Sequence, residues 1–207
     1  MIDIASQREN MIDVIEQIKV NTIFGKTLET ILSPIDVPEE NHKAMLFTAF
    51  LQDSLSHFYS INILIDKKLY NSAFALVRVF FDTLVRGQYL VYIMEDTLVN
   101  SMYNENIEWK FPKTKNMCKE LDTFFDEQIF DNIRTATYEM MCDYTHIGRN
   151  QIARHFNDAK ATVEPNFSIE LILDTLKSSS TLMKLFAKNY IAFMQDSELL
   201  DKSVSLA

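Results

Sequence analysis

The chain has 207 residues, 47% of them hydrophobic and 12% aromatic, which excludes an intrinsically disordered protein. A net charge of −9 and an isoelectric point of about 4.9 exclude broad binding to duplex DNA, which requires a basic surface. With only 3 glycines and 4 prolines, the chain has few residues that favour turns. The composition therefore favours long helices, and the length predicts a single domain spanning residues 1–207.

The N-terminal third predicts two long helices. Apolar residues recur at three- and four-residue steps over residues 4–32, which is typical of an amphipathic helix. Asp36 and Glu39 resemble a capping box, with Pro38 in the first turn of the helix that they would open. We expect this second helix to run to about Leu69.

The third helix is expected over residues 73–94. A short turn at 70–72, with Asn71 or Ser72 as the N-cap, predicts that it runs antiparallel to the second helix. Sixteen of its 22 residues are apolar, and a helix that is apolar on nearly all sides is normally buried. We expect this segment at the centre of the molecule. It is long enough to span a bilayer, but its three charged residues favour a soluble core helix.

The remaining segments predict shorter helices and one long one. Residues 97–112 are mixed in character, and residues 113–125 predict a short helix. The other expected features are a helix opened by Asp126 or Asp131 that ends near Ile147, a last helix from Ser168 to about Gln195, and a frayed tail over 197–207. Together these segments predict an all-α, mostly antiparallel bundle of six or seven helices around a buried central helix.

The cysteines and the N-terminus predict a cytoplasmic protein. Cys118 and Cys142 form neither a metal-binding pattern nor a disulfide framework. The first ten residues lack the apolar core of a signal peptide.

The first candidate for a functional site lies on the central helix. Arg78, Asp82 and Arg86 follow one another at four-residue intervals, so they share a broad face and Asp82 can pair with either arginine. Buried charges cost several kcal/mol per ion unless they are paired. One interpretation is a salt bridge that locks the helix to its neighbours. The other is that Asp82 orients Arg78, whose guanidinium then binds a phosphate or a carboxylate.

The second candidate is a polar stripe near the end of the following long helix. The stripe consists of Glu139, Asp143, His146 and either Arg149 or Asn150, which are spaced by three or four residues and so lie on one face while the helix lasts. An acid, a base and a cation on one stripe are sufficient for general acid/base catalysis, although a histidine at a helix end can also be a simple cap. The first three could ligate a metal, but no second Glu-x-x-His is present. We therefore predict no metal and no cofactor.

The third candidate is the pair Arg149-x5-His155. This spacing resembles the R-x4-6-H motif of HEPN-type ribonucleases, which are all-helical, often dimeric and frequent in toxin–antitoxin and phage-defence systems. The resemblance implies metal-independent RNA cleavage in which an arginine and a histidine act on the ribose 2′-hydroxyl and the phosphate. Six residues of a continuous helix rotate by about 240°, so the two side chains would point apart. They could converge across a dimer or in an irregular segment.

Two longer stretches resemble an uncharacterised bacterial helical family. They are the R-x3-[DE]-x3-R pattern of Arg78, Asp82 and Arg86, and the T-H-x-G element from Thr145 to Gly148. The resemblance implies that Arg78, Asp82 and His146 belong to one polar site between packed helices.

Two functional hypotheses follow. The first is a HEPN-like, metal-independent ribonuclease or toxin-type protein of bacterial defence. In it, His146 or His155 is the acid/base, Arg149 and Arg78 bind phosphate, and Asp82 orients Arg78. The alternative is a non-enzymatic interaction or small-anion-sensing module. We expect a homodimer, with RNA or an antitoxin as a further partner, and neither duplex DNA nor a membrane.

Overall fold

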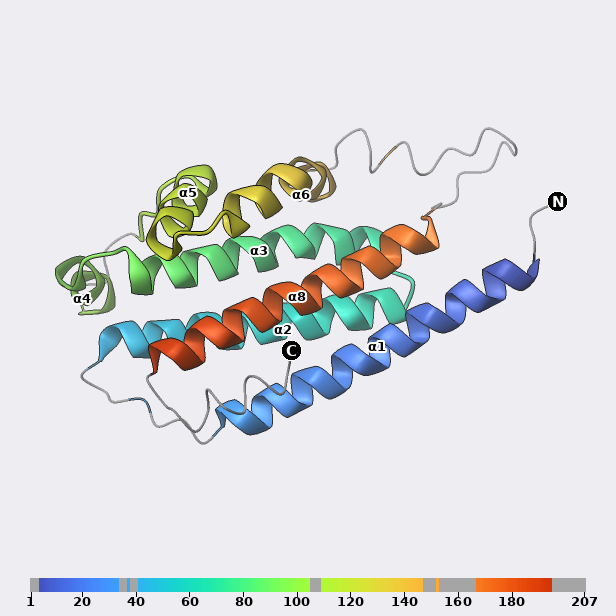
Figure 1. Ribbon diagram of the computed structural model, residues 1–207, viewed down its shortest axis with the longest axis horizontal. Coiled ribbons are helices and arrows are strands. Elements are labelled where there is room, and N and C mark those ends of the chain that lie inside the picture. Colours follow the sequence, from blue (N-terminus) through green and yellow to red (C-terminus); the bar gives the residue numbers. More distant parts are fainter. Residues whose placement is uncertain are drawn as a thin grey trace.

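The computed structural model describes residues 4–33, 37, 41–104, 109–146, 152 and 167–194, without the side chains of residues 4–10 and 139–140. This part of the chain is all-helical and contains no strand, as the sequence predicts. Its helices are α1 (Ile4–Leu32), α2 (His42–Asp66), α3 (Tyr70–Tyr92), α4 (Asp96–Asn104), α5 (Thr114–Phe125), α6 (Ile129–Thr145) and α8 (Ile169–Phe193). The bundle is assembled around α3 (Figure 1).

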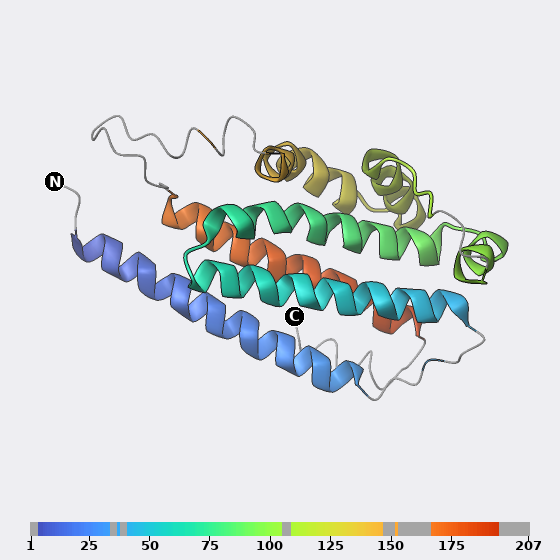
Figure 2. The same ribbon diagram turned by 180° about the vertical axis from the view of Figure 1, so that it is seen from behind.

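The central position of α3 confirms the expectation for residues 73–94. Helices α2 and α8 pack on one side of α3, and α5 and α6 cover its other side (Figures 1 and 2). Helix α1 packs against α2 and α8, away from α3. Helices α2 and α3 form the antiparallel hairpin that the short connection between them predicts.

Aromatic side chains fill the core between α2, α3 and α8. The ring of Phe47 on α2 is fully buried, and its centroid lies 5.1 Å from that of Phe186 and 5.4 Å from that of Tyr190 on α8. Phe80 and Phe81 on α3 are also fully buried. Aromatic pairs at these separations contribute about 0.5–1.5 kcal/mol beyond the area they bury, so they help to hold the long helices together.

The starts of two helices differ from the sequence prediction. Helix α2 begins at His42, later than expected, and Asn41 caps it by accepting a hydrogen bond from the N–H of Ala44. The residues of the expected capping box, Asp36 and Glu39, lie outside the described residues. The turn before α3 lies at Lys67–Leu69, where Lys68 adopts a left-handed φ of 59°. Asn71 and Ser72 thus lie inside the helix and do not cap it.

The cap of α6 is also corrected. Asp126 is the left-handed C-cap residue of α5, with φ 53°, and Asp131 lies in the first turn of α6. The side chain of Asp122 on α5 accepts the hydrogen bonds that cap α6. The mixed stretch 97–112 contains most of the short helix α4, which was not expected. In contrast, the predicted Ser168 cap of α8 is confirmed, since its Oγ accepts from the N–H of Leu171.

Two tyrosines on α3, the buried Tyr89 and the partly buried Tyr92, predict how stability depends on pH. Burial, followed by the hydrogen bond to Glu120, raises the pKa of Tyr89 from 10.0 to about 12, and burial raises the pKa of Tyr92 to about 12. Because these folded-state pKa values exceed the unfolded value, the associated stability is complete below pH 10 and is lost as the pH rises towards 12. Urea unfolding at a series of pH values should show this loss.

Absorbance at 295 nm provides the matching spectroscopic measurement. The folded protein should retain at least three protonated tyrosines, Tyr59, Tyr89 and Tyr92, at a pH where the urea-unfolded chain has ionised all of its tyrosines. Tyr92→Phe should remove one of these late ionisations. If all tyrosines titrate together near pH 10 in the folded protein, burial does not raise the pKa values of Tyr89 and Tyr92.

Candidate functional site

A polar cluster lies where α3 meets α5 and α6. Arg78 and Asp82 come from the middle of α3, Thr114 from the first residue of α5, and Tyr138 and His146 from α6 and its C-cap. The hydroxyl of Thr145 lies 3.4 Å from the carbonyl oxygen of Ala75, which connects the end of α6 to α3. Three segments that are distant in the sequence therefore contribute to this cluster.

Arg78 is the centre of the cluster. Its Nη1 is hydrogen-bonded to Nε2 of His146, 68 residues further along the chain, at 2.5 Å. Its Nη2 donates to the hydroxyl of Tyr138 at 3.4 Å, and its Nε lies 3.6 Å from Oδ2 of Asp82. The guanidinium carbon also lies 5.2 Å from the centre of the Tyr138 ring. Every nitrogen of the guanidinium thus has a neighbour, but only one of these neighbours is an anion.

Asp82 is held in place from the opposite side. The hydroxyl of Thr114 donates to Oδ1 of Asp82 at 3.0 Å, and the hydroxyl of Tyr138 lies 3.4 Å from the same oxygen. The carboxylate therefore has one oxygen directed towards Thr114 and the other towards Arg78. Such an arrangement fixes the orientation of the guanidinium.

The cluster lies at the boundary between core and solvent. The side chains of Arg78 and Asp82 are 20% and 19% exposed, whereas His146 is an exposed residue. Burial acts to lower the pKa of Arg78, but the hydrogen bond and charge of Tyr138 and the charges of Cys142 and Asp82 outweigh it and raise the pKa. Arg78 therefore remains a cation, and solvent reaches the cluster through His146.

The contact with Arg78 determines which ring nitrogen of His146 carries the proton. A guanidinium has only donors, so Nε2 of His146 must accept, and the neutral imidazole then carries its proton on Nδ1. Protonation of Nε2 would convert this nitrogen into a second donor facing Arg78. Arg78 and His146 can therefore hydrogen-bond to each other, or both can donate hydrogen bonds to a third group that lies between them.

Arg86 does not belong to the cluster. It is exposed, and its guanidinium carbon lies 5.5 Å from the centre of the Phe111 ring. Asp82 pairs with Arg78, one of the two options that the four-residue spacing allows. The expectation of three charges on one buried stripe is therefore corrected, because only Arg78 and Asp82 are substantially buried.

The other predicted site residues have different positions. Asp143 is half-buried on α6, one turn before His146. Arg149 and His155 lie outside the described residues, and so does the side chain of Glu139. The interaction of Arg149 with His155 accordingly stays a prediction.

The sequence-based prediction did not include two members of the cluster, Tyr138 and Thr114. Tyr138 precedes Cys142 by four residues and His146 by eight, so its place on the same face of α6 could have been recognised. Thr114 carries no comparable signal, because its contact with Asp82 depends on how α5 packs against α3.

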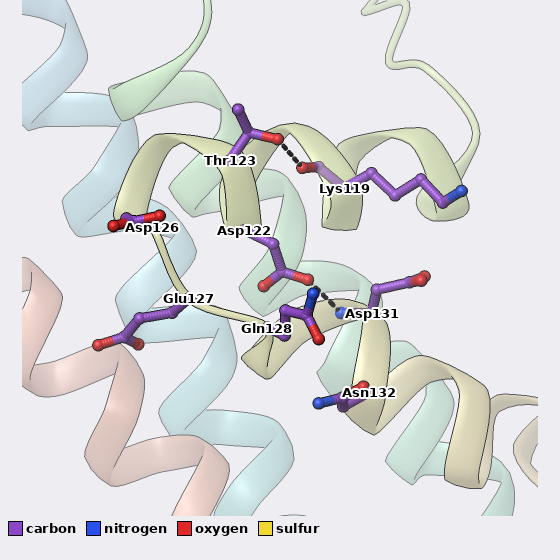
Figure 3. Close-up of a pocket in the computed structure, with 8 residues that line it drawn as sticks. All are labelled: Lys119, Asp122, Thr123, Asp126, Glu127, Gln128, Asp131 and Asn132. Carbon is purple, nitrogen blue, oxygen red and sulfur yellow. Dashed lines mark hydrogen bonds between the residues drawn. The ribbon is translucent and has the colours of Figure 1, made fainter.

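A cavity lies elsewhere, at the turn between α5 and α6 (Figure 3). Its volume is about 730 Å³, and its lining includes the side chains of Lys119, Asp122, Asp126, Glu127 and Asp131. The carboxylate of Asp122 caps α6, and that of Asp131 pairs with Arg134 at 2.7 Å. Two of its carboxylates therefore already have structural partners.

The comparisons with known proteins give a family and no function. None of the described helices is long and apolar enough to cross a membrane. No curated protein and no solved structure matches the chain. The model of a family of unknown function (DUF6988) matches residues 52–207, which include the described parts of the polar cluster. The chain therefore belongs to this family of unknown function.

Proposed function

We propose that this protein is a helical module that binds a small anion, a phosphate or a carboxylate, through Arg78 and His146. The observation that carries the proposal is the hydrogen bond between Nη1 of Arg78 and Nε2 of His146. It joins a cation to an exposed imidazole at the edge of the bundle, where a ligand can reach both groups.

The guanidinium of Arg78 retains binding capacity. It has five N–H donors, and its contacts with Asp82 at 3.6 Å and with Tyr138 at 3.4 Å are longer than the 2.7–2.9 Å typical of charge-assisted hydrogen bonds. Asp82 also accepts from Thr114. The carboxylate therefore fixes the orientation of the guanidinium without using all of its N–H donors. This leaves Arg78 able to bind an additional anion.

Anion binding at this position requires a change of tautomer at His146. An oxygen between the two side chains accepts from Nη1 of Arg78, and it accepts from Nε2 of His146 only when that nitrogen carries the proton of the imidazole. The neutral tautomer with its proton on Nε2 meets this requirement.

Calorimetric titration with inorganic phosphate tests the proposal. The wild type should bind phosphate, and Arg78→Gln should lower the affinity at least tenfold, because a hydrogen bond to a charged group contributes about 1.5–3 kcal/mol and 1.4 kcal/mol is a factor of ten. Arg86→Gln is the matched control, since it removes an exposed arginine from the same helix.

One result would count against anion binding at this position. It is an equal loss of affinity in Arg78→Gln and Arg86→Gln, which would indicate only a non-specific effect of net charge.

A metal-independent ribonuclease of the HEPN type is the second candidate. The observation that favours it is an exposed imidazole, His146, in contact with a cation, Arg78, which can supply an acid/base group and a phosphate ligand. Arg149 and His155 would complete the active centre. Such an enzyme would act as a toxin-type protein of bacterial defence with an antitoxin as partner. It would act in the cytoplasm, in keeping with the free thiols of Cys118 and Cys142.

RNA cleavage in buffer containing EDTA tests this candidate. The wild type should cleave RNA, and His146→Ala or His155→Ala should abolish cleavage. His57→Ala is the control, because His57 is a half-buried residue on α2. A wild type that cleaves no RNA while it binds phosphate would reject the ribonuclease and leave the anion-binding module.

A further inference from the structure

One side of α1 faces away from the bundle. This helix packs against α2 and α8 and lies at the edge of the molecule (Figures 1 and 2). Five large apolar side chains on it are exposed: Met11, Ile12, Ile15, Val20 and Ile23. Contiguous exposed apolar surface of this kind marks an interaction site in a soluble protein.

The central stripe of this exposed side is symmetric. Ile12, Glu16, Lys19 and Ile23 are separated by four, three and four residues, so they lie in one row along the helix. Each end of the row is apolar, and the middle holds an exposed pair of opposite charges, Glu16 and Lys19, at 2.7 Å. Read from either end, the row is an isoleucine, two charged residues and an isoleucine. Only the order of the negative and the positive charge differs between the two directions.

The two halves of the exposed side differ in shape. The C-terminal half borders a groove of about 520 Å³ between α1 and α8, lined by Val20, Ile23 and Phe24 on α1 and by residues of α8 that include Lys177 and Lys184. The N-terminal half contributes Ile12 and Ile15, whose side chains are exposed. One half can therefore receive apolar side chains, and the other half can supply them.

We infer that this side of α1 binds a second copy of the chain, with the two α1 helices antiparallel about a two-fold axis between Gln17 and Ile18. In this register Ile12 faces the partner's Ile23. Each copy thus places its Ile12 at the groove of the other. Such a self-complementary contact is the geometry of a closed homodimer.

The charges agree with this register. Glu16 of one copy faces the partner's Lys19, and the two-fold axis repeats the pair, so the interface has two complementary contacts at its centre. A parallel, in-register pairing would instead place like charges side by side. The helix α1 precedes the part of the chain that matches the family, residues 52–207, and the inference is independent of the anion site.

Sedimentation equilibrium of the full chain tests the inference. The wild type should be a dimer at micromolar concentration, and Ile12→Asp should raise the dissociation constant at least tenfold. Ile63→Asp on α2 is the matched control, because the two isoleucines are 58% and 59% exposed. A monomeric wild type, or equal effects of the two substitutions, would overturn the inference.

Charge reversal tests the register. Glu16→Lys and Lys19→Glu should each weaken the dimer at least tenfold, because like charges then face each other twice. An equimolar mixture of the two variants should dimerise as well as the wild type, because every charge again faces its opposite. Each variant still lacks its own Glu16–Lys19 pair in the mixture, so recovery reports contacts between chains. A mixture that stays as weak as the single variants would reject the antiparallel register.

Discussion

Replacing Asp122 with alanine is expected to lower the free energy of unfolding by about 3 kcal/mol. The residue is 8% exposed, and its carboxylate accepts hydrogen bonds at 2.8 Å from the N–H groups of Phe130 and Asp131, in the first turn of α6. These donors have no partner within their own helix. Hydrogen bonds to a charged group contribute about 1.5–3 kcal/mol each, and the truncation removes two of them.

The substitution should act on the corner between α5 and α6. Urea unfolding followed by circular dichroism gives the change in free energy, and Glu127→Ala is the matched control because it removes an exposed carboxylate from the same cavity (Figure 3). The control should unfold within about 0.5 kcal/mol of the wild type. Equal stability of the two variants would mean that water replaces the Asp122 carboxylate at the start of α6.

The second large effect is expected at Gly87, in the middle of α3. A Cβ atom at this position would lie 2.9 Å from Cβ of Phe50 and 3.0 Å from Cζ of Phe186. The Cβ of Phe50 cannot move without its backbone, so α2 and α3 would have to separate. Overpacking of this kind costs about 1–3 kcal/mol. The helical preference of alanine over glycine offsets at most about 1 kcal/mol of it.

We therefore expect Gly87→Ala to lower the free energy of unfolding by about 2 kcal/mol. Thermal and urea unfolding measure this change, and Thr83→Ala, one turn earlier on α3, is the control that improves helical preference without adding a buried atom. At Gly25 the new Cβ would meet only the ring and hydroxyl of Tyr59, the far end of a flexible side chain, so a smaller cost is expected there. A stabilised Gly87→Ala variant would show that α2 and α3 can adjust their separation freely.

The helices were predictable where the apolar pattern is local and regular. The expected ranges 4–32 and 113–125 agree closely with α1 and α5, because apolar spacing reports which face of a helix is buried. Helix starts were less predictable. Asp36, Asn71 and Asp131 are all suitable cap residues by type, yet the actual capping groups belong to Asn41 and Asp122. The choice among several suitable residues depends on where the chain turns in three dimensions.

The candidate site was also predictable only where its residues lie close together in the sequence. Arg78 and Asp82 are four residues apart on one helix, so their pairing follows from helix geometry and could be anticipated. Thr114 and Tyr138 are 32 and 56 residues away from Asp82, and no local rule connects them. The resemblance to a helical family linked His146 to Arg78 before the structure did, but it gave no distance, exposure or tautomer.

The sequence by itself determined that this protein is all-helical, that residues 73–94 form its central helix, and that Arg78 and Asp82 share a face, because these properties follow from periodicity within a single helix. Only the tertiary structure decided that Arg86 contacts the ring of Phe111, that Asp122 caps a neighbouring helix, and that His146 is hydrogen-bonded to Arg78. These contacts depend on how helices pack against one another. Packing is decided by the fit of many side chains together, which no short stretch of sequence contains.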